Sequence, residues 1–300
     1  MNISYILYTI KGDEVENMDI NLIKDLYDLH VNGFENAFGN VYKNKKYDFV
    51  FNNSIKDCYD NFISNFDVNN LKEFQSFINE ISKELKNVNR KMILYVLPFM
   101  NECYQNREKY FSKDQFEIVS KESWQIYTDY KMINNIKTNC PYNVELQLAD
   151  NMENYASYML DCFKSDNKDD PYGDIDEGYG KAYANFQSRY DNIKCNAYYI
   201  KANGNIVGVS QSVSNNKYYG IYGLAIKEEY RKKGIGKKSL LQHLKKCKES
   251  GIKLAFLQTE KDYYPYEIYK SMGFKDLFTA YYYLKKDEWK ENYTWFLKYI

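Results

Sequence analysis

Two glycines surrounded by cations, in the segment EEYRKKGIGKK at residues 228–238, form the clearest candidate for chemistry in this chain. Glycine lets an anion approach the backbone closely, and five Lys and Arg side chains add positive charge around it. If a helix begins at this turn, its first N–H groups have no partner inside the helix, and its dipole adds partial positive charge. The segment could therefore hold a phosphate or pyrophosphate, or it could be a solvated basic turn.

The residues before the turn predict three antiparallel strands in succession. Asn203-Gly204 is a strong hairpin signal, and the apolar residues around it place strands near 197–201, 206–214 and 218–226. The glycine segment follows the third strand directly. A turn that closes an antiparallel meander is not a Rossmann fingerprint, and the GxxxxGK[ST] motif of nucleotide-binding P-loops is also absent.

The residues after the turn predict an amphipathic helix. Leu240, Leu244 and Cys247 share one apolar face of it, and Gly251 ends it. Later elements are expected as a buried strand at 253–260, a short helix within 264–274, a strand at 278–286 and a packed helical tail containing Trp289 and Trp295.

In this context the glycine segment resembles the motif [RQ]xxGx[GA] of the GNAT superfamily of acyl-CoA-dependent N-acyltransferases. Here the motif reads Arg231-Lys232-Lys233-Gly234-Ile235-Gly236, and IYKSMGF at 268–274 is similar to a later helix of the family. The resemblance covers residues 142–286. It implies a mixed α/β fold of GNAT type and acetyl-CoA as the acyl donor, without a metal.

The family resemblance also implies where the donor binds. Backbone amides of Arg231 through Lys237 would hold the CoA pyrophosphate, and main-chain groups of two strand residues would bind the pantetheine arm. The implied cofactor-binding residues are Leu224, Ile226, Arg231, Lys232, Lys233, Gly234, Ile235, Gly236 and Lys237.

Tyr269 stands where many family members carry the tyrosine that protonates the departing CoA thiolate, although it could be a merely packed tyrosine. The chain departs from the family at the fourth strand, where Gly220 replaces a glutamate that acts as the base. It departs again in the later helix, where Asp262 and Pro265 replace the family's Asn and Ala. The base could then be Glu260 or a water chain. Glu260 could also be only a solvated carboxylate at the end of its strand.

A glycine- and proline-containing loop at 165–180 carries six carboxylates in the region that covers the acceptor in this family. These charges would attract a cationic amine, namely a small polycation, a lysine side chain or an N-terminal amine. The loop could equally be a solvated acidic surface.

The N-terminal half predicts the same order of elements as the chain after residue 236. A helix at 71–85, a strand at 91–99, a helical segment at 101–110 and strands at 115–120 and 122–130 follow one another. Asp67-Val68-Asn69-Asn70 stands where a glycine turn would be. We therefore predict a degenerate GNAT-like or accessory domain at 1–135 and a catalytic domain at 142–300, joined through 134–143.

The composition limits the possible partners of the protein and its location in the cell. The net charge is zero, which argues against nucleic acid as a partner, and the longest apolar run, at 92–100, is too short for a membrane span. Six scattered cysteines and the lack of a signal-peptide pattern predict a cytoplasmic protein, and abundant Asn, Lys and Ile suggest a bacterial source.

Of the two histidines, we expect His243 to be exposed, and we expect Cys247 to lie in the core.

Two rival functions follow from the same residues. The missing glutamate on the fourth strand would suit a non-catalytic acyl-CoA-binding or sensing protein. The basic turn would suit a phosphate contact to nucleic acid, against which the acidic loop and the zero net charge argue.

Overall fold

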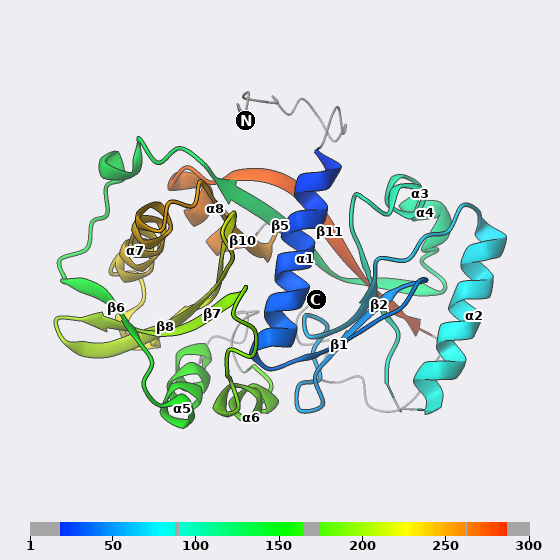
Figure 1. Ribbon diagram of the computed structural model, residues 1–300, viewed down its shortest axis with the longest axis horizontal. Coiled ribbons are helices and arrows are strands. Elements are labelled where there is room, and N and C mark those ends of the chain that lie inside the picture. The colour runs from blue at the N-terminus through cyan, green and yellow to red at the C-terminus, as the bar shows by residue number, and fades with distance from the viewer. Residues whose placement is uncertain (1–18, 88–89, 165–174, 262, 287–300) are drawn as a thin grey trace.

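One mixed β-sheet runs through the whole computed structural model, which describes residues 19–87, 90–164, 175–261 and 263–286 (Figure 1). Its eleven described strands lie in the order β1-β2-β3-β4-β11-β5-β10-β9-β8-β7-β6. Helices cover the sheet, so the mixed α/β architecture expected from the sequence is confirmed.

The C-terminal half contains the expected meander, glycine turn and helix. Its elements are β6 (Val144–Leu148), α5 (Met152–Phe163), α6 (Gly178–Ala184), β7 (Lys194–Ala202), β8 (Asn205–Ser214), β9 (Tyr218–Ile226), α7 (Ile235–Glu249), β10 (Leu254–Glu260), α8 (Tyr264–Ser271) and β11 (Lys275–Lys285). Strands β7, β8 and β9 pair antiparallel, and β10 pairs parallel to β9. The parallel pair is possible because α7 carries the chain back across the sheet.

The N-terminal half repeats this order. Its elements are α1 (Ile20–Ala37), β1 (Asn40–Lys43), β2 (Asp48–Phe51), β3 (Asn61–Ser64), α2 (Leu71–Asn87), β4 (Ile93–Val96), α3 (Asn101–Gln105), α4 (Arg107–Tyr110) and β5 (Phe116–Tyr127). The two strands predicted at 115–120 and 122–130 are wrong as separate elements. They form the single strand β5, whose register with β11 shifts by one residue at Val119.

The two halves exchange their last strands. Strand β5 of the N-terminal half pairs with β10, and β11 of the C-terminal half pairs with β4, while β5 and β11 pair with each other at the centre. The predicted boundary between residues 135 and 142 therefore divides the chain along its sequence, whereas the sheet is continuous across the two halves.

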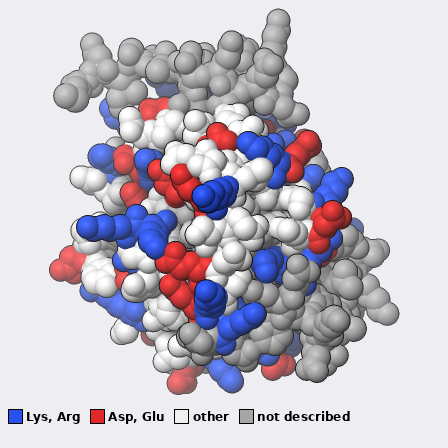
Figure 2. Space-filling view, turned by 90° about the vertical axis from the view of Figure 1, so that its right-hand side faces the viewer, with Lys and Arg blue, Asp and Glu red and all other residues white. Residues whose placement is uncertain are grey.

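The surface shows no large area of one charge on the face that Figure 2 presents. Lys and Arg side chains alternate there with Asp and Glu over a mostly neutral surface. Within the described residues, no helix combines the length and apolar character needed to cross a bilayer.

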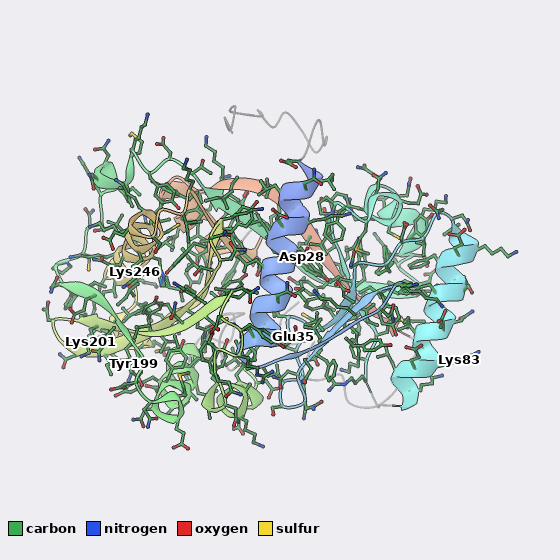
Figure 3. All side chains as sticks on the ribbon, viewed as in Figure 1. Asp28, Glu35, Lys83, Tyr199, Lys201 and Lys246 are labelled. Atoms are coloured by element: carbon green, nitrogen blue, oxygen red, sulfur yellow. The ribbon has the colours of Figure 1, made fainter. Side chains whose placement is uncertain are left out.

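Helix α1 crosses the middle of the molecule in front of the sheet (Figure 3). Asp19 caps its N-terminus by accepting hydrogen bonds from the backbone N–H groups of Asn21 and Leu22. Its outer side carries Asp28, whereas Ile23 and Leu26 on its inner side are fully buried. This helix of the N-terminal half contacts β7, β8 and β9 of the C-terminal half.

The expectation that His243 is exposed is wrong. The side chain is fully buried on the inner face of α7. Its ring nitrogens form hydrogen bonds with Tyr219 OH at 3.0 Å and Ser210 Oγ at 2.9 Å. Cys247 is also fully buried, as expected. The predicted acidic loop ends at Gly178, where α6 begins, and its residues 165–174 lie outside the described residues, as does the tail with Trp289 and Trp295.

Candidate active site

The glycine turn between β9 and α7 exposes a row of backbone N–H groups. Lys232 and Gly234 have positive φ angles of 60° and 76°, and α7 begins at Ile235. Gly234 is the N-cap residue, so no side chain caps this helix. The N–H groups of Gly234 through Lys237 make no hydrogen bond to any residue in the described part of the chain. Alternating left-handed residues ahead of a bare helix N-terminus form an anion-binding nest.

Most cations of this segment serve to hold the turn in place. Arg231 donates to the carbonyl oxygens of Ile226 at 2.9 Å and Cys162 at 2.9 Å, which fastens the turn to the ends of β9 and α5. Lys237 Nζ lies 3.0 Å from Ser271 Oγ of α8. Lys232, by contrast, is exposed and has no hydrogen-bond or ion-pair partner among the described residues, so its ammonium group can turn toward a bound anion.

Lys233 is placed differently from the other predicted cofactor residues. It does not line the cavity described below, and its Nζ donates to the carbonyl oxygen of Glu229 at 2.7 Å. Its side chain therefore stabilises the turn, and only its backbone remains available to a ligand.

Strands β9 and β10 separate beside this turn. Their parallel pairing ends at Ile221–Leu257, before β9 reaches its last five residues. A β-bulge then sets Gly223 and Leu224 opposite Ser210 of β8, with Gly223 at φ 53°. Because of this separation, the β10-facing edge of residues 222–226 has no strand partner within the described structure. An extended ligand chain could hydrogen-bond to that edge.

A cavity of about 1330 Å³ connects the glycine turn with this opening and continues between the two halves of the chain. Eight of the nine predicted cofactor-binding residues line it, and so do both predicted catalytic residues. The predicted residues in its wall are Leu224, Ile226, Arg231, Lys232, Gly234, Ile235, Gly236, Lys237, Glu260 and Tyr269. The tertiary structure therefore brings together residues that are up to 45 positions apart.

Tyr269 lies half-buried on α8, with its ring centroid 6.2 Å from that of Phe274. The helix follows β10 and ends where Gly273 adopts φ 97°. This placement leaves the phenol in the cavity wall on the same side of the sheet as α7. A phenol in this place could donate a proton to a leaving group held between β9 and β10.

Gly220 cannot be replaced by a carboxylate without rearrangement of the core. A Cβ added there would stand 2.8 Å from the ring of Phe256 and 2.6 Å from that of Tyr222. Packing against these rings explains why glycine occupies the position at which the family resemblance implies a base.

The opposite side of the cavity is acidic and aromatic, and the loop between β2 and β3 supplies much of it. Asp57 and Asp60 both accept from the Tyr179 hydroxyl, which has only one proton to donate. Burial raises the pKa of each carboxyl; the charge of Asp57 raises the pKa of Asp60 further, and the charge of Asp176 raises the pKa of Asp57. The pair therefore holds a proton readily, or it can be neutralised by a cation that enters the cavity.

Two further carboxylates meet at the centre of the sheet. Glu260 of β10 and Glu122 of β5 are direct cross-strand partners. The Tyr59 hydroxyl donates to Glu260 Oε1 at 3.0 Å, and Glu122 is 6% exposed. Nearby on the same face of β10, the buried amide nitrogen of Gln258 has no hydrogen-bond partner among the described residues.

His30 of α1 completes this side of the cavity. Its Nδ1 lies 3.2 Å from Tyr222 OH, and its ring meets Trp124 edge-on at 5.6 Å between centroids. Burial lowers the pKa of His30 to about 4, so the imidazole is neutral at pH 7. It can act there as a hydrogen-bonding group rather than as a cation.

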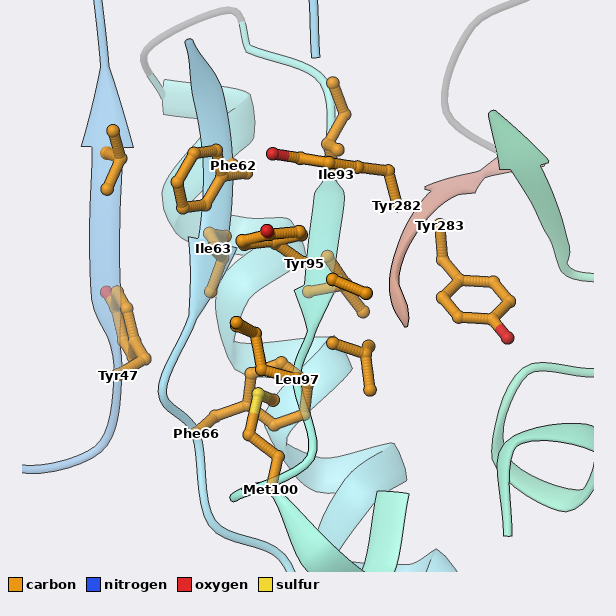
Figure 4. Packing of buried hydrophobic residues seen from close by; sticks show 14 of the residues in the cluster. Tyr47, Phe62, Ile63, Phe66, Ile93, Tyr95, Leu97, Met100, Tyr282 and Tyr283 are labelled. Carbon is orange, nitrogen blue, oxygen red and sulfur yellow. The ribbon is translucent and has the colours of Figure 1, made fainter. Parts of the chain in front are cut away.

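The corresponding place in the N-terminal half is filled and capped. Phe66, Leu97 and Met100 are buried where β3 and β4 end, and they pack together (Figure 4). Asn70 Oδ1 accepts from the N–H of Glu73, and Glu73 Oε2 accepts from the N–H of Asn69. This capping box sets a carboxylate at the N-terminus of α2, where α7 has glycine and cations.

Apart from Glu260, sequence reasoning missed the acidic and aromatic side of the cavity. Glu122, Asp57, Asp60, Tyr179 and His30 come from four separate elements, and no spacing along the chain connects them. The lack of a basic carboxylate at Gly220 on β9 was the one indication that another element must contribute the catalytic base.

Comparisons with known proteins agree with this fold. Residues 156–274 match the model of the acetyltransferase (GNAT) family. A GCN5-related N-acetyltransferase from Kribbella flavida superimposes with a TM-score of 0.61 at 11% identity, over 87% of this chain and 94% of that one. A conserved protein of unknown function from Staphylococcus epidermidis gives a TM-score of 0.55 at 14% identity, over 83% and 94%.

The two-part architecture also has a counterpart among solved structures. A tandem GNAT protein from the clavulanic acid biosynthesis pathway superimposes with a TM-score of 0.51 at 9% identity, over 73% of this chain and 70% of that one. At these identities the likeness concerns the fold alone. No curated protein matches the chain.

Proposed function

Because residues 156–274 form a GNAT acetyltransferase domain, whose family transfers acyl groups from acyl-CoA, we propose that this protein moves an acetyl group from acetyl-CoA to a primary amine. One observation carries the proposal. The uncapped N-terminus of α7 and the unpaired edge of β9 open into the same cavity, which continues to a side lined by carboxylates.

The donor would bind on the α7 side of the sheet. The N–H groups of Gly234 through Lys237 and the Lys232 ammonium group would hold the pyrophosphate, and the edge of β9 at Leu224 and Ile226 would hold the pantetheine arm. Gly236 suits this role because a Cβ there would still leave ordinary van der Waals distances of 3.8 Å to Leu224 and 3.9 Å to Ile226.

The acceptor would enter from the opposite side, where Asp57, Asp60 and Glu260 line the cavity. These carboxylates favour a cationic amine, either a small polycation or the amine of a lysine or an N-terminus. Since the predicted loop at 165–180 is described only from residue 175, Asp57 and Asp60 carry this argument better than the loop does.

In the reaction, the neutral amine nitrogen would attack the thioester carbonyl directly. As the C–S bond breaks, Tyr269 would give its proton to the CoA thiolate and regain one from the amine nitrogen. Glu260, at the end of β10, would pass to solvent the proton that the ammonium group must lose first. No metal is part of the proposed reaction.

The proposed setting is the cytoplasm of a bacterium, which the six free cysteines support. The mixed charges of Figure 2 support a small-molecule or peptide acceptor rather than nucleic acid.

The test is isothermal titration of acetyl-CoA into the wild type, Gly236→Ala and Gly236→Glu. We expect micromolar binding by the wild type and Gly236→Ala, because the cavity accommodates the methyl group. Gly236→Glu should abolish binding, because its carboxylate occupies the pyrophosphate site. Equal binding by all three proteins would refute the donor site.

A second candidate function is supported by Gly220 alone. Since packing excludes a carboxylate at this position, a protein that binds acyl-CoA without transferring the acyl group remains the alternative. Tight acetyl-CoA binding without release of free thiol, over a panel of polyamines and lysine peptides, would favour this alternative.

A further inference from the structure

Glu122 reaches the catalytic half of the protein only through the strand exchange. It lies on β5, which the N-terminal half contributes, and pairs directly with Glu260 on β10. Residues opposite each other in an antiparallel pair point to the same face of a sheet. Glu122 therefore shares the face of Gln258 and Glu260, where α1 lies, and it lines the cavity.

This carboxylate is held by one oxygen only. Its Oε2 accepts from the hydroxyl of Tyr95 and, at 3.2 Å, from Nε1 of Trp124. Its other oxygen has no hydrogen-bond partner in the described part of the chain, and no Lys or Arg there forms an ion pair with it. A carboxylate anchored at one oxygen is oriented and keeps its second oxygen for a ligand.

Among the described residues, the groups around Glu122 add no positive charge. His30 from α1 is neutral, and the remaining titratable neighbours come from β4, β9, β10, β11 and the loop before β3. They are Tyr95, Tyr222, Glu260, Tyr282, Cys58 and Tyr59. Burial raises the pKa of Glu122 to about 7, the bonds from Tyr95 and Trp124 lower it, and the charge of Glu260 raises it.

We propose that Glu122 is the group that takes the proton from the amine before attack. The proposal rests on the proposed function, and it makes the N-terminal half part of the catalytic site. A thioester held in the opening between β9 and β10 would present its carbonyl to the face on which Glu122, Gln258 and Glu260 lie.

The proton balance is complete with these groups. The ammonium R–NH₃⁺ gives one proton to the Glu122 carboxylate, which later releases it to solvent through Glu260. The amine nitrogen forms the C–N bond, the C–S bond breaks with its electron pair on sulfur, and the second amine proton replaces the one that Tyr269 gives to the thiolate. The products are the amide, CoA–SH and one proton.

The experiment compares the wild type, Glu122→Gln, Glu260→Gln and, as a matched control, Glu145→Gln on the exposed side of β6. Spermidine and acetyl-CoA are the probes. Glu122→Gln should keep the Kd for acetyl-CoA but lose about 10²- to 10⁴-fold in kcat/KM at pH 7. Its remaining rate should rise about tenfold per pH unit, since only amine that is already neutral reacts. Glu145→Gln should match the wild type.

A second measurement does not depend on turnover. In protein labelled with ¹³C at the glutamate carboxyls, the resonance missing from Glu122→Gln should titrate near pH 7 in the wild type and shift on addition of spermidine. A midpoint at the ordinary glutamate value overturns the proposal, as does a Glu122→Gln variant with the wild-type pH profile. If the wild type binds acetyl-CoA but does not acetylate spermidine, the proposed acceptor fails, and the ¹³C titration still decides the role of Glu122.

Discussion

The carbonyl oxygen of Asn139 lies 2.8 Å from the point where a Cβ of Gly234 would stand. The segment that joins the two halves thus closes over the glycine turn, and Gly234 with φ 76° fits beneath it. The two glycines of the motif consequently have different tasks. Gly234 allows the turn to form, and Gly236 leaves space for a ligand.

Gly234→Ala should destabilise the protein by about 1–2 kcal/mol or more, because a side chain at this φ is strained and its Cβ meets the Asn139 carbonyl. Gly236→Ala should change the free energy of unfolding little, because its surroundings are open and the position is helical. Urea unfolding of both variants measures the difference. Equal stabilities would contradict the assigned tasks.

Tyr269→Phe should lower kcat by about 10²-fold and leave the Kd for acetyl-CoA unchanged, because only the proton donor is removed and the ring remains. Steady-state kinetics together with calorimetric titration separate the two effects. Tyr42→Phe on β1, an exposed tyrosine outside the cavity, is the matched control and should behave as the wild type. A Tyr269→Phe variant of full activity would assign Tyr269 a packing role only.

Phe66→Ala should cost about 3–5 kcal/mol of stability, because the ring is 2% exposed and stacks on Phe77 with 4.7 Å between centroids. At temperatures where the variant stays folded, it should bind one acetyl-CoA per chain with the wild-type affinity. The N-terminus of α2 should not bind a second one, because the side chains of Asn70 and Glu73 already cap it. Thermal unfolding and calorimetry test both expectations. A second acetyl-CoA bound per chain would show that the N-terminal half also has a donor site.

His243 should make the fold acid-sensitive. Burial, and secondarily the nearby charge of Lys246, lower the pKa of this histidine to about 3, so the folded state binds its proton less readily than the unfolded state. Its contribution to stability is present above the ordinary pKa near 6.5 and is lost as the pH falls below it, by about 1.4 kcal/mol per pH unit.

His243→Gln removes this titration while keeping a polar group for Ser210 and Tyr219. The difference in unfolding free energy between wild type and variant should therefore change in favour of the variant between pH 6.5 and 4. Denaturant unfolding across this range measures it, and a difference that is independent of pH would show that His243 has the same pKa in the folded and unfolded states.

Local patterns in the sequence were sufficient for the part of the C-terminal half that runs from β7 to β11. The hairpin at Asn203-Gly204, the apolar face of Leu240 and Leu244, and the glycine after α7 each depend on neighbours a few residues apart. The same kind of pattern found the donor side of the site, because the strand, turn and helix that form it are contiguous in the chain.

His243 shows where local reasoning fails. A polar residue beside Leu244 on an amphipathic helix is expected to face solvent, yet it lies against Ser210 and Tyr219, which satisfy both ring nitrogens. Only strands distant in sequence provide those partners. Likewise, two strands were expected on either side of Lys121, whereas pairing with both β10 and β11 keeps β5 continuous.

The sequence by itself determined the order of elements from α2 to α4 and from β7 to β11, the glycine turn ahead of α7 and the absence of a comparable turn ahead of α2, because contacts between near neighbours specify these features. The tertiary structure alone decided that β5 and β11 exchange places. A strand pattern shows which residues face the core but not which strand lies beside it. That exchange puts Glu122 of one half next to Glu260 of the other, and the acceptor side of the site exists only in the folded protein.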